Sequence, residues 1–511
     1  MASSEMTKVN QAPRVPPPPR VVIVGGGLAG LAAAVALADR DLHITLLEGR
    51  PRLGGRAASF ADPATNELID NCQHVSMSCC TNLADFCRRA GVRDLFRVVP
   101  EVLFLSPEGR ESRLRADSLP APFHLTSSFL TANYLTPVER LRVGWGMACL
   151  RFGRARKGEP FGAWLRRHGQ TVRVIDRFWA TVLVSAINEQ LDRMDFDHAR
   201  QVFIEGFLRD KTGHRMELPL APLGDLYGVR LERYLASKGV DVRLKTGVRV
   251  LDVDDEGAIR GVTLRDGQTV PADIVVLAVP FDRVTDMVPA TARARLPRLD
   301  ALQTIETSPI TGIHLWFDRE VCPYEHVAIL GRTVQWVFNH TALQGRRSPE
   351  GGGQYLQLVV SASHDLAARS NQDVLAIALA DLRALWSEAS TARLVHSRVV
   401  TEHAATFSAR PGIDAVRPPQ RTGIDGLFFA GDWTDTGWPA TMEGAVRSGY
   451  LAAEQVTIDL GRPARLLVPD LPGTWLTRLL LGKRPARKRP PGRQAVAPMA
   501  LDSRTGRVGV S

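Results

Sequence analysis

The sequence lacks any run of about eighteen apolar residues, the length that a membrane-spanning helix requires, apart from a stretch at 21–37 that glycines interrupt. Its N-terminal part also lacks the apolar core of a secretion signal. We therefore expect no transmembrane segment, a disordered leader over residues 1–19 and a cytoplasmic location. Peripheral contact with a membrane surface stays compatible with these absences.

Cysteine is scarce and irregularly spaced. The chain has 6 cysteines in 511 residues, a pattern typical of reduced thiols rather than of a disulfide framework. Cys72, Cys79, Cys80 and Cys87 lie close together in the sequence, but their spacing matches no C-x2-C zinc pattern. We expect packed core thiols and no metal site.

Excess charge is confined to the end of the chain. The formal net charge is +10, and the residues after Gly461 carry eleven Arg or Lys against two Asp. The body is therefore close to neutral and is not expected to bind nucleic acid. Within the tail, residues 471–489 join large apolar side chains to a basic cluster. This pattern is typical either of a short helix that binds an anionic membrane surface, on the inner face of the cell membrane, or of a solvated tail.

The strongest motif lies at residues 21–48. Four β-branched residues precede Gly25, Gly27 and Gly30 in G-x-G-x-x-G register, and an alanine-rich helix and a second strand ending at Glu48 follow. Gly25 permits the tight turn, Gly27 lets a pyrophosphate approach the backbone, and Gly30 lets the helix pack on the strand. The helix N-terminus favours negative charge, and Glu48 is placed to accept hydrogen bonds from a ribose. The stretch predicts a dinucleotide-binding fold.

A second glycine turn follows, Gly54-Gly55-Arg56, with an arginine positioned either to reach a phosphate or on a basic surface loop. His74, beside a polar turn, is either structural or placed on the cofactor side.

Other segments alternate between sheet and helix. Residues 102–223 are rich in large apolar groups and predict helices that form a core or line a long apolar cavity. A β-meander at 246–267 precedes a buried strand at 272–280, and residues 307–321 and 354–363 predict strands of a second sheet. A last strand at 427–430 delivers Gly431 and Asp432 ahead of a helix that begins near Thr441.

Nucleotide-binding features thus occur in three separate segments, 21–60, 247–280 and 427–457. An NAD site would be contiguous, whereas a flavin needs a second contact at its ribityl and isoalloxazine end. Asp432 can accept ribityl hydroxyls, and the helix N-terminus at Thr441 can stabilise a negative flavin ring. This ordering resembles the glutathione-reductase-type FAD oxidoreductases, which include amine oxidases and carotenoid desaturases.

The resemblance implies an α/β fold in which a glutathione-reductase-type FAD-binding Rossmann domain is interleaved with a substrate domain of mixed sheet and helices. We expect the FAD-binding domain to comprise residues 20–80, 225–290 and 395–460. The substrate-binding domain would comprise residues 81–224 and 291–394, and residues 461–511 would form a basic, disordered tail.

Four segments narrow the resemblance: IDNCQHV, SPITGIHLWFDR, ATFSARPG and, most specifically, LFFAGDWTDTGWPATMEGAVRSG. They are similar to the squalene-associated FAD-dependent desaturase family, whose best-described members are hydroxysqualene dehydroxylases. Residues 20–457 carry this similarity, which implies FAD as cofactor, a long-chain isoprenoid substrate and the reductive removal of an allylic hydroxyl to give squalene for hopanoid or sterol synthesis. Cys72 departs from the small residue expected before Gln-His. The FAD-binding residues that the motifs and the resemblance indicate are Gly25, Gly27, Ala29, Gly30, Glu48, Arg56, Val248, Gly431, Asp432, Thr441 and Met442.

Alternatives remain at the level of the reaction. Flavin amine oxidases carry a lysine near the flavin, and this chain has no lysine between Lys245 and Lys483, so amine oxidation is not expected. A phytoene-type desaturase and a non-catalytic isoprenoid carrier stay open. For the dehydroxylation we expect Asp435 or His74 to protonate the departing hydroxyl, and squalene-synthase-like enzymes to be partners.

Overall fold

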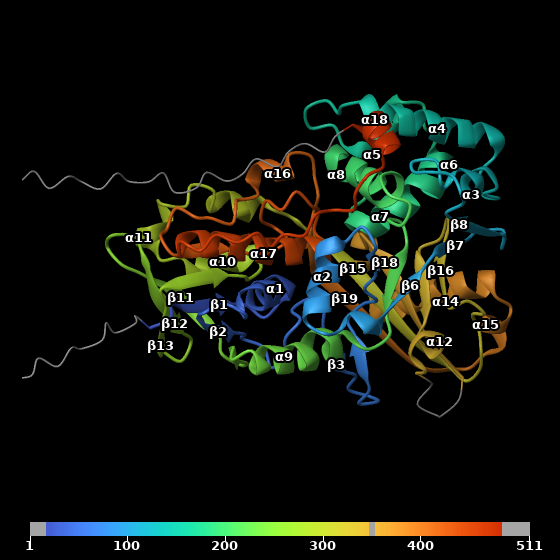
Figure 1. The fold of residues 1–511 in the computed structure, drawn as a ribbon. Coiled ribbons are helices and arrows are strands. Elements are labelled where there is room, and N and C mark those ends of the chain that lie inside the picture. The colour runs from blue at the N-terminus through green and yellow to red at the C-terminus, as the bar shows by residue number, and fades with distance from the viewer. Residues whose placement is uncertain (1–16, 347–352, 483–511) are drawn as a thin grey trace, which may run out of the picture.

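The computed structural model describes residues 17–346 and 353–482 (Figure 1). The predicted leader and the basic cluster of the tail lie almost wholly outside these residues. All 6 cysteines are free thiols. Of the helices in the described ranges, none is both long and apolar enough to cross a bilayer.

The first sheet is the parallel sheet of the nucleotide fold. Its strands run in the order β10 (Asp241–Arg243), β2 (His43–Leu47), β1 (Arg20–Val24), β14 (Ile274–Leu277) and β20 (Leu427–Phe429). Because helices cover both faces of such a sheet, its strands are near-continuous apolar runs. The strands predicted at 21–24, 272–280 and 427–430 therefore meet side by side, although they lie far apart in the sequence.

Four helices pack around this sheet: α1 (Leu28–Leu37), α2 (Thr81–Arg89), α9 (Leu231–Ser237) and α17 (Met442–Asp459). Every residue of α1 is buried. Helix α17 contacts α1 closely because Gly449 lies against Ala29 O, where a Cβ would collide. Helix α2 belongs to this core as well, although the sequence analysis assigned residues from 81 onward to the substrate domain. Its apolar residues Leu83 and Phe86 bury against the nucleotide sheet and its helices.

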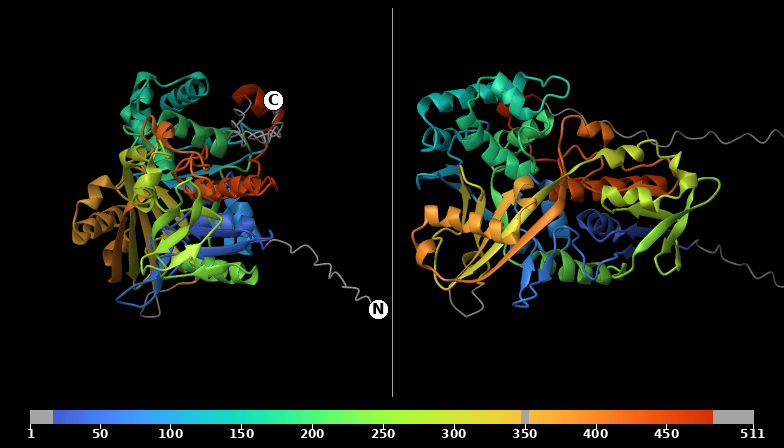
Figure 2. Two further views of the ribbon diagram at one scale, coloured as in Figure 1. Left: turned by 90° about the vertical axis from the view of Figure 1, so that its left-hand side faces the viewer. Right: turned by 180° about the vertical axis from the view of Figure 1, so that it is seen from behind.

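The predicted β-meander is present as β11 (Val248–Val253), β12 (Ile259–Leu264) and β13 (Thr269–Pro271), paired antiparallel in sequence order. It lies at the end of the molecule that carries the first sheet (Figures 1 and 2).

The second sheet has seven strands in the order β19 (Leu394–Phe407), β15 (Thr307–Phe317), β18 (Gln354–Ser361), β17 (Trp336–Asn339), β16 (His326–Ile329), β7 (Glu101–Leu105) and β8 (Glu111–Arg115). The predicted pair at 307–321 and 354–363 is confirmed. Two expectations are wrong. Residues 101–115 form a hairpin around a Ser-Pro-Glu-Gly turn instead of starting a helical region. Residues 394–407 pair with β15 in this sheet, instead of joining the FAD-binding domain at 395.

Helices cover the second sheet on one side and build a separate layer at one end of the molecule (Figures 1 and 2). The covering helices are α14 (Asn371–Leu385) and α15 (Glu388–Thr391). The sequence predicts helices for residues 102–223, and the helical layer confirms them for residues 126–208. The layer buries Phe161, Trp164 and Trp179. It contains α3 (Thr126–Leu130), α4 (Pro137–Phe152), α5 (Phe161–Arg167), α6 (Val172–Val174), η2 (Ile175–Ala180), α7 (Thr181–Ile187), α8 (Phe196–Gln201) and η3 (Val202–Leu208).

Helix α18 (Trp475–Leu481) forms where the tail predicts a short helix. It docks on the helical layer, because Arg151 Nε donates to Leu480 O at 2.7 Å and Thr474 Oγ1 donates to Ala121 O at 3.4 Å. Residues 461–482 are thus packed against the body, and the prediction of a disordered tail is wrong for them.

Short elements connect these layers. They are β3 (Ser59–Ala61), β4 (Leu68–Asp70), β5 (Ser76–Met77), η1 (Arg93–Leu95), β6 (Phe96–Val99), β9 (Met216–Pro219), η4 (Gly224–Arg230), α10 (Phe281–Met287), α11 (Ala290–Arg293), η5 (Asp300–Thr304), α12 (His340–Gln344), α13 (His364–Ala367) and α16 (Ile413–Val416).

Candidate functional site

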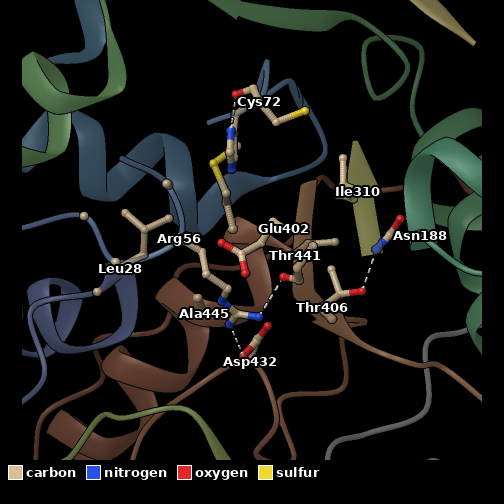
Figure 3. A pocket seen from close by; sticks show the side chains of 18 of the residues that line it. Leu28, Arg56, Cys72, Asn188, Ile310, Glu402, Thr406, Asp432, Thr441 and Ala445 are labelled. Carbon is tan, nitrogen blue, oxygen red and sulfur yellow. Dashed lines mark hydrogen bonds and ion pairs between the residues drawn. The ribbon is translucent and has the colours of Figure 1, made fainter. Parts of the chain in front are cut away.

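A cavity of about 890 Å³ extends from the carboxyl ends of the first sheet to the second sheet and the helical layer (Figure 3). This is the edge at which open α/β sheets bind ligands. Ten of the predicted cofactor-binding residues line it: Gly25, Gly27, Ala29, Glu48, Arg56, Val248, Gly431, Asp432, Thr441 and Met442. Gly30 does not line it. Its Cβ would collide with Gly25 O, so this glycine serves the helix–strand contact.

One end of the cavity is a cradle of backbone. Gly25 and Gly54 have positive φ angles of 109° and 98°, and Gly54 N donates to Gly26 O at 2.9 Å, which holds the two glycine turns together. Gly27 is the N-cap of α1 and makes no side-chain cap hydrogen bond. A Cβ at Gly27 would meet nothing closer than Gly55 Cα at 3.9 Å. The first turn of α1 therefore presents free N–H groups to open space, which suits a pyrophosphate.

Glu48 closes the adenosine end of this cradle. Its carboxylate accepts hydrogen bonds from Gly26 N and Arg50 N, both at 2.7 Å, and its carbonyl accepts from Thr246 N at 2.9 Å. These bonds fix the carboxylate at the cavity wall and leave lone pairs for ribose hydroxyls. Val248 stands beside it on the same wall, at the start of the meander.

The middle of the cavity is organised by an ion pair. Arg56 Nη2 donates to Asp432 Oδ1 at 2.7 Å, and Arg56 Nη1 donates to Ala405 O at 2.8 Å (Figure 3). Burial lowers the pKa of Arg56, but the carboxylates of Asp432, Glu402 and Asp282 raise it overall, so the guanidinium stays charged. The sequence analysis assigned Arg56 to a phosphate and Asp432 to ribityl hydroxyls. The structure joins the two, which ties the first segment, β19 and the last segment together.

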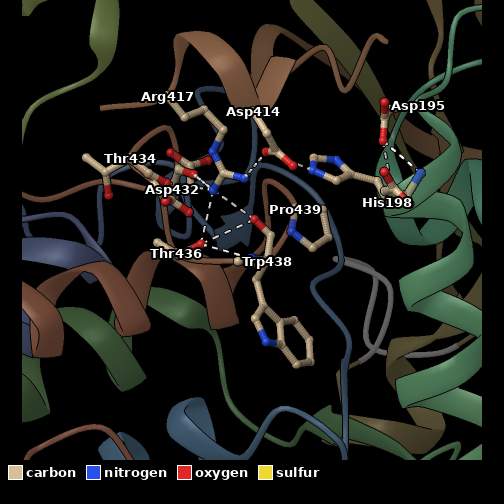
Figure 4. A network of polar contacts seen from close by, with 12 residues as sticks. Asp195, His198, Asp414, Arg417, Asp432, Thr434, Thr436, Trp438 and Pro439 are labelled. Carbon is tan, nitrogen blue, oxygen red and sulfur yellow. Dashed lines mark hydrogen bonds and ion pairs between the residues drawn. The ribbon is translucent and has the colours of Figure 1, made fainter. Parts of the chain in front are cut away.

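The buried Arg417 holds the loop of residues 432–438, which follows the last strand of the first sheet (Figure 4). Arg417 Nη2 donates to Thr434 O at 2.6 Å, Trp438 O at 2.8 Å and Asp432 O at 3.0 Å. Its Nη1 pairs with Asp414 at 2.8 Å, and Asp414 contacts His198 Nε2 at 3.2 Å. The network fixes the backbone of residues 432–438 and connects it to α8. Sequence reasoning missed Arg417, whose partners lie up to 21 residues away.

The N-terminus of α17 faces the cavity through Thr441, Met442 and Ala445. Thr441 is the N-cap, and its Oγ1 accepts from Gly444 N at 3.0 Å. The acid of the first turn, Glu443, is buried and accepts from Leu83 N and Arg447 Nε, both at 2.7 Å, so its charge is directed away. The positive end of this 18-residue helix is therefore free to stabilise an anion in the cavity.

His74 lines the cavity, and its Nδ1 lies 2.8 Å from Cys72 O. A carbonyl only accepts, so Nδ1 carries the hydrogen and Nε2 has the lone pair. Burial lowers the pKa of His74, and the nearby Arg56 charge lowers it further. The lowered pKa favours the neutral ring, which can accept a hydrogen bond at Nε2, so the assignment of His74 as proton donor stays a prediction that this geometry does not favour. Burial also raises the pKa of the Cys72 thiol to about 12, so it stays protonated.

Asp435 is exposed and does not line the cavity. Its backbone N–H donates to Pro418 O at 2.8 Å. The assignment of Asp435 as proton donor is therefore corrected. Three carboxylates of described residues line the cavity: Glu48, Asp432 and Glu402. Glu402, on β19, is the one held neither by the glycine turn nor by an ion pair with Arg56, and Figure 3 shows its carboxylate beside Arg56.

The far part of the cavity is apolar. Trp336 Nε1 is satisfied by Ser185 Oγ at 2.9 Å, and Asn188 Nδ2 by Thr406 Oγ1 at 2.9 Å, so these polar atoms do not face the space unpaired. The apolar wall combines β-sheet and helical-layer residues: Val102, Phe104, Leu114, Val182, Phe207, Met216, Ile310, Trp336, Phe338 and Val359. Such a wall suits a hydrocarbon chain.

Comparisons with known proteins agree with this geometry. Residues 28–457 match the family model described as flavin containing amine oxidoreductase. The chain is 26% identical over 468 residues to 15-cis-phytoene desaturase of Solanum lycopersicum, which covers 88% of this chain and 79% of the relative. It is 28% identical over 453 residues to hydroxysqualene dehydroxylase of Sinorhizobium fredii, covering 86% and 98%. Its fold matches cyclohexylamine oxidase from Brevibacterium oxydans with a TM-score of 0.62 at 18% identity, covering 87% and 100%.

Proposed function

The chain belongs to the flavin-containing amine oxidoreductase family and uses FAD, and we propose that it removes the allylic hydroxyl of hydroxysqualene to give squalene. The observation that supports this most is the union, in one cavity, of the glycine cradle with an apolar wall. The similarity to a hydroxysqualene dehydroxylase and the segments quoted above favour this substrate. As a member of an oxidoreductase family, the chain is an enzyme, and the carrier alternative is set aside.

The proposed reaction breaks a C–O bond, forms a C–H bond and releases water, consuming two electrons and two protons. Reduced FAD, when bound, supplies the electron pair. The cradle of Gly25 and Gly27, with Ala29, Glu48 and Val248, would hold the adenosine and pyrophosphate. Arg56, Gly431 and Asp432 would hold the ribityl chain, and Thr441 and Met442 the ring, where the α17 dipole favours negative charge.

We assign the proton donor to Glu402, which would first take up one of the two protons that the reaction consumes and then pass it from its carboxyl group to the departing hydroxyl oxygen. The apolar wall excludes water, so the cation that forms as the C–O bond breaks is not trapped by solvent. Neutral His74 would accept a hydrogen bond at Nε2 from the substrate hydroxyl and so orient that hydroxyl. The cavity wall contains no lysine among the described residues, which favours this chemistry over amine oxidation.

A desaturase of the phytoene type is the second candidate, since the relatives include 15-cis-phytoene desaturases. Both substrates are long, water-insoluble isoprenoids. We therefore also propose a peripheral location on the inner face of the cell membrane, and squalene-synthase-like partner enzymes that supply the substrate.

The two activities are separated by product analysis. The purified FAD-loaded protein is incubated with a chemical reductant and hydroxysqualene, or with an electron acceptor and phytoene, and products are identified by mass spectrometry. The proposal expects squalene from the first mixture and no desaturated product from the second. If desaturated phytoene formed and squalene did not, the dehydroxylase proposal would be wrong and the phytoene-type desaturase would take its place.

A further inference from the structure

Seven of the large exposed apolar side chains of the described residues belong to two helices, α4 and α18. Helix α4 exposes Val138, Leu141, Trp145 and Phe152, by 58%, 76%, 62% and 78%. Helix α18 exposes Trp475 by 74%, Leu479 by 70% and Leu480 by 37%. We call these seven side chains the α4–α18 face. Outside this face, the large apolar side chains that are exposed lie on several other elements and loops: Val172 by 70%, Leu130 by 54%, Phe123 by 47%, Val229 by 45%, Leu119 by 44%, Val98 by 42% and Leu68 by 38%.

The pattern of α4 shows that this exposure is built into the helix. Its buried residues include Val143, Gly146 and Leu150, which pack on the helical layer. The exposed residues recur at spacings of three, four and seven, which places them in one stripe on the opposite side. A surface helix of a globular protein normally carries polar residues there. Helix α4 therefore has two apolar faces, one that packs on the core and one that is exposed among the described residues.

The two helices form one continuous surface. Arg151 bridges them, since its Nε donates to Leu480 O at 2.7 Å and its guanidinium lies 4.8 Å from the centre of the Phe152 ring. Figures 1 and 2 show α4 and α18 at the same end of the molecule, on the helical layer.

The exposed charged residues of these two segments have one sign. Residues 137–157 contain six Arg or Lys and one acid, Glu139, which is buried and paired with Arg173. Arg142, Arg154 and Lys157 are exposed. Residues 474–482 contain Arg478 and no acid, and the basic cluster from Lys483 follows directly in the sequence. Exposed Trp, Phe and Leu rimmed by cations match the interface of an anionic bilayer, with rings at the headgroup level.

We propose that the α4–α18 face inserts into the headgroup region of an anionic lipid bilayer. The tail alone does not form this surface, because α18 is docked on α4 and the larger apolar stripe belongs to α4. The same helical layer contributes Val182 and Phe207 to the cavity wall, so the inserted part and the apolar end of the cavity belong to one layer. The inference rests on the proposed function in one respect, that the enzyme takes a lipid-soluble substrate. Binding of the protein to lipid vesicles can be measured without any substrate.

The test is flotation of the FAD-loaded full chain with vesicles of phosphatidylcholine, or of phosphatidylcholine mixed equally with phosphatidylglycerol. We expect binding to the mixed vesicles. The triple variant Leu141→Gln, Trp145→Gln, Phe152→Gln should bind roughly tenfold more weakly or worse. The matched triple Leu68→Gln, Val98→Gln, Val229→Gln should bind as the wild type does. A chain ending at Gly482 should keep α18 and most of the binding.

Flavin content and thermal unfolding check that the triple variant is folded. A second measurement does not depend on it. Brominated lipids should quench part of the tryptophan fluorescence, and the double variant Trp145→Phe, Trp475→Phe should float normally but lose most of that quenching.

Equal flotation of both triple variants, or quenching unchanged in the double variant, would overturn the proposal. So would a dimer in sedimentation that the α4 triple variant disrupts, without vesicle binding by the wild type, because a second copy would then cover the face. Loss of squalene formation with intact vesicle binding would contradict the proposed function alone.

Discussion

Arg56 and Asp432, 376 residues apart in the sequence, form an ion pair of 2.7 Å in the middle of the cavity. The carboxylate is almost fully buried, whereas the arginine side chain is 37% exposed. The pair joins the glycine turn after β2 to the segment after β20, and the third bond, to Ala405 O, adds the long strand of the second sheet.

Asp432→Asn should weaken FAD binding by about 2 kcal/mol, roughly 30-fold, because it removes a charged acceptor at the ribityl position and leaves the Arg56 charge unpaired. The measurement is FAD titration of the apoprotein by fluorescence. Asp435→Asn, three residues along and exposed, is the matched control and should bind FAD and turn over like the wild type. Impaired turnover in Asp435→Asn would restore that residue as a candidate acid.

Two glycines of the first motif should respond differently to alanine. Gly27→Ala places a methyl group in open space at the cradle, so thermal unfolding of the apoprotein should be unchanged while FAD affinity falls. Gly30→Ala collides with Gly25 O and should lower the stability of the apoprotein itself. If Gly27→Ala retained wild-type FAD affinity, the pyrophosphate would not lie against this turn.

Glu402→Gln should lower turnover by roughly a hundredfold or more, the usual contribution of a general acid, with FAD content unchanged. Its neighbour His403 is exposed on the same strand, and His403→Gln serves as the control with full activity. A Glu402→Gln variant that retained full turnover would leave the proton to come from the substrate, from water or from another group.

Arg417→Met should destabilise the protein by roughly 3–5 kcal/mol, because four acceptors and the Asp414 carboxylate lose a buried cation. Since two of those acceptors belong to Asp432 and Thr434, FAD affinity should fall as well. Arg421→Met removes another partly buried ion pair, with Asp459, away from the cavity. It should reduce thermal stability without changing FAD affinity. Equal FAD affinity in both variants would show that the hydrogen bonds of Arg417 do not contribute to FAD binding.

Stability of the apoprotein should fall as the pH is lowered from about 6.5. Burial lowers the pKa of His314 to about 3 and those of His340 and His214 to about 4. Below the ordinary value of 6.5 the unfolded chain binds these protons and the folded chain does not, so acid favours unfolding. Asp70, whose burial raises its pKa to about 6, opposes the trend, but it is one group against three.

Denaturant unfolding across this pH range measures the effect. His340→Gln keeps a polar partner for Gln357, which lies 2.8 Å from His340 Nε2, and should flatten the pH dependence by up to about 1.4 kcal/mol per pH unit. A wild-type stability that stayed constant or rose down to about pH 5 would contradict the assignment of neutral buried histidines.

The sequence predicts well where the signal is local. The turn at Gly25 to Gly30, the strand before Gly431 and the helix after Thr441 each have their turn or cap residue beside them, so neighbouring residues determine the conformation. Residues 102–115 show the opposite case. Their apolar character favours a helix, whereas the Pro-Glu-Gly turn after Ser106 marks the hairpin that the structure contains.

The contacts that complete the site depend on distant partners. Nothing near Glu402 indicates that its side chain lines the cavity, because β19 is half-exposed and mixes polar with apolar residues. The pairing of Arg56 with Asp432 and the clamp of Arg417 likewise require the folded arrangement. The motifs and the resemblance indicated ten residues that line the cavity, but the sequence does not show that Asp435, three residues after Asp432, is exposed and outside the lining.

The most direct test of the account is a single turnover without oxygen. Protein whose FAD has been reduced is mixed with one equivalent of hydroxysqualene, and flavin absorbance is followed while squalene is quantified. The account predicts that the oxidised flavin spectrum returns and that squalene forms in equal amount. Flavin that stays reduced in the presence of hydroxysqualene, together with oxidised flavin that is bleached by phytoene, would contradict it.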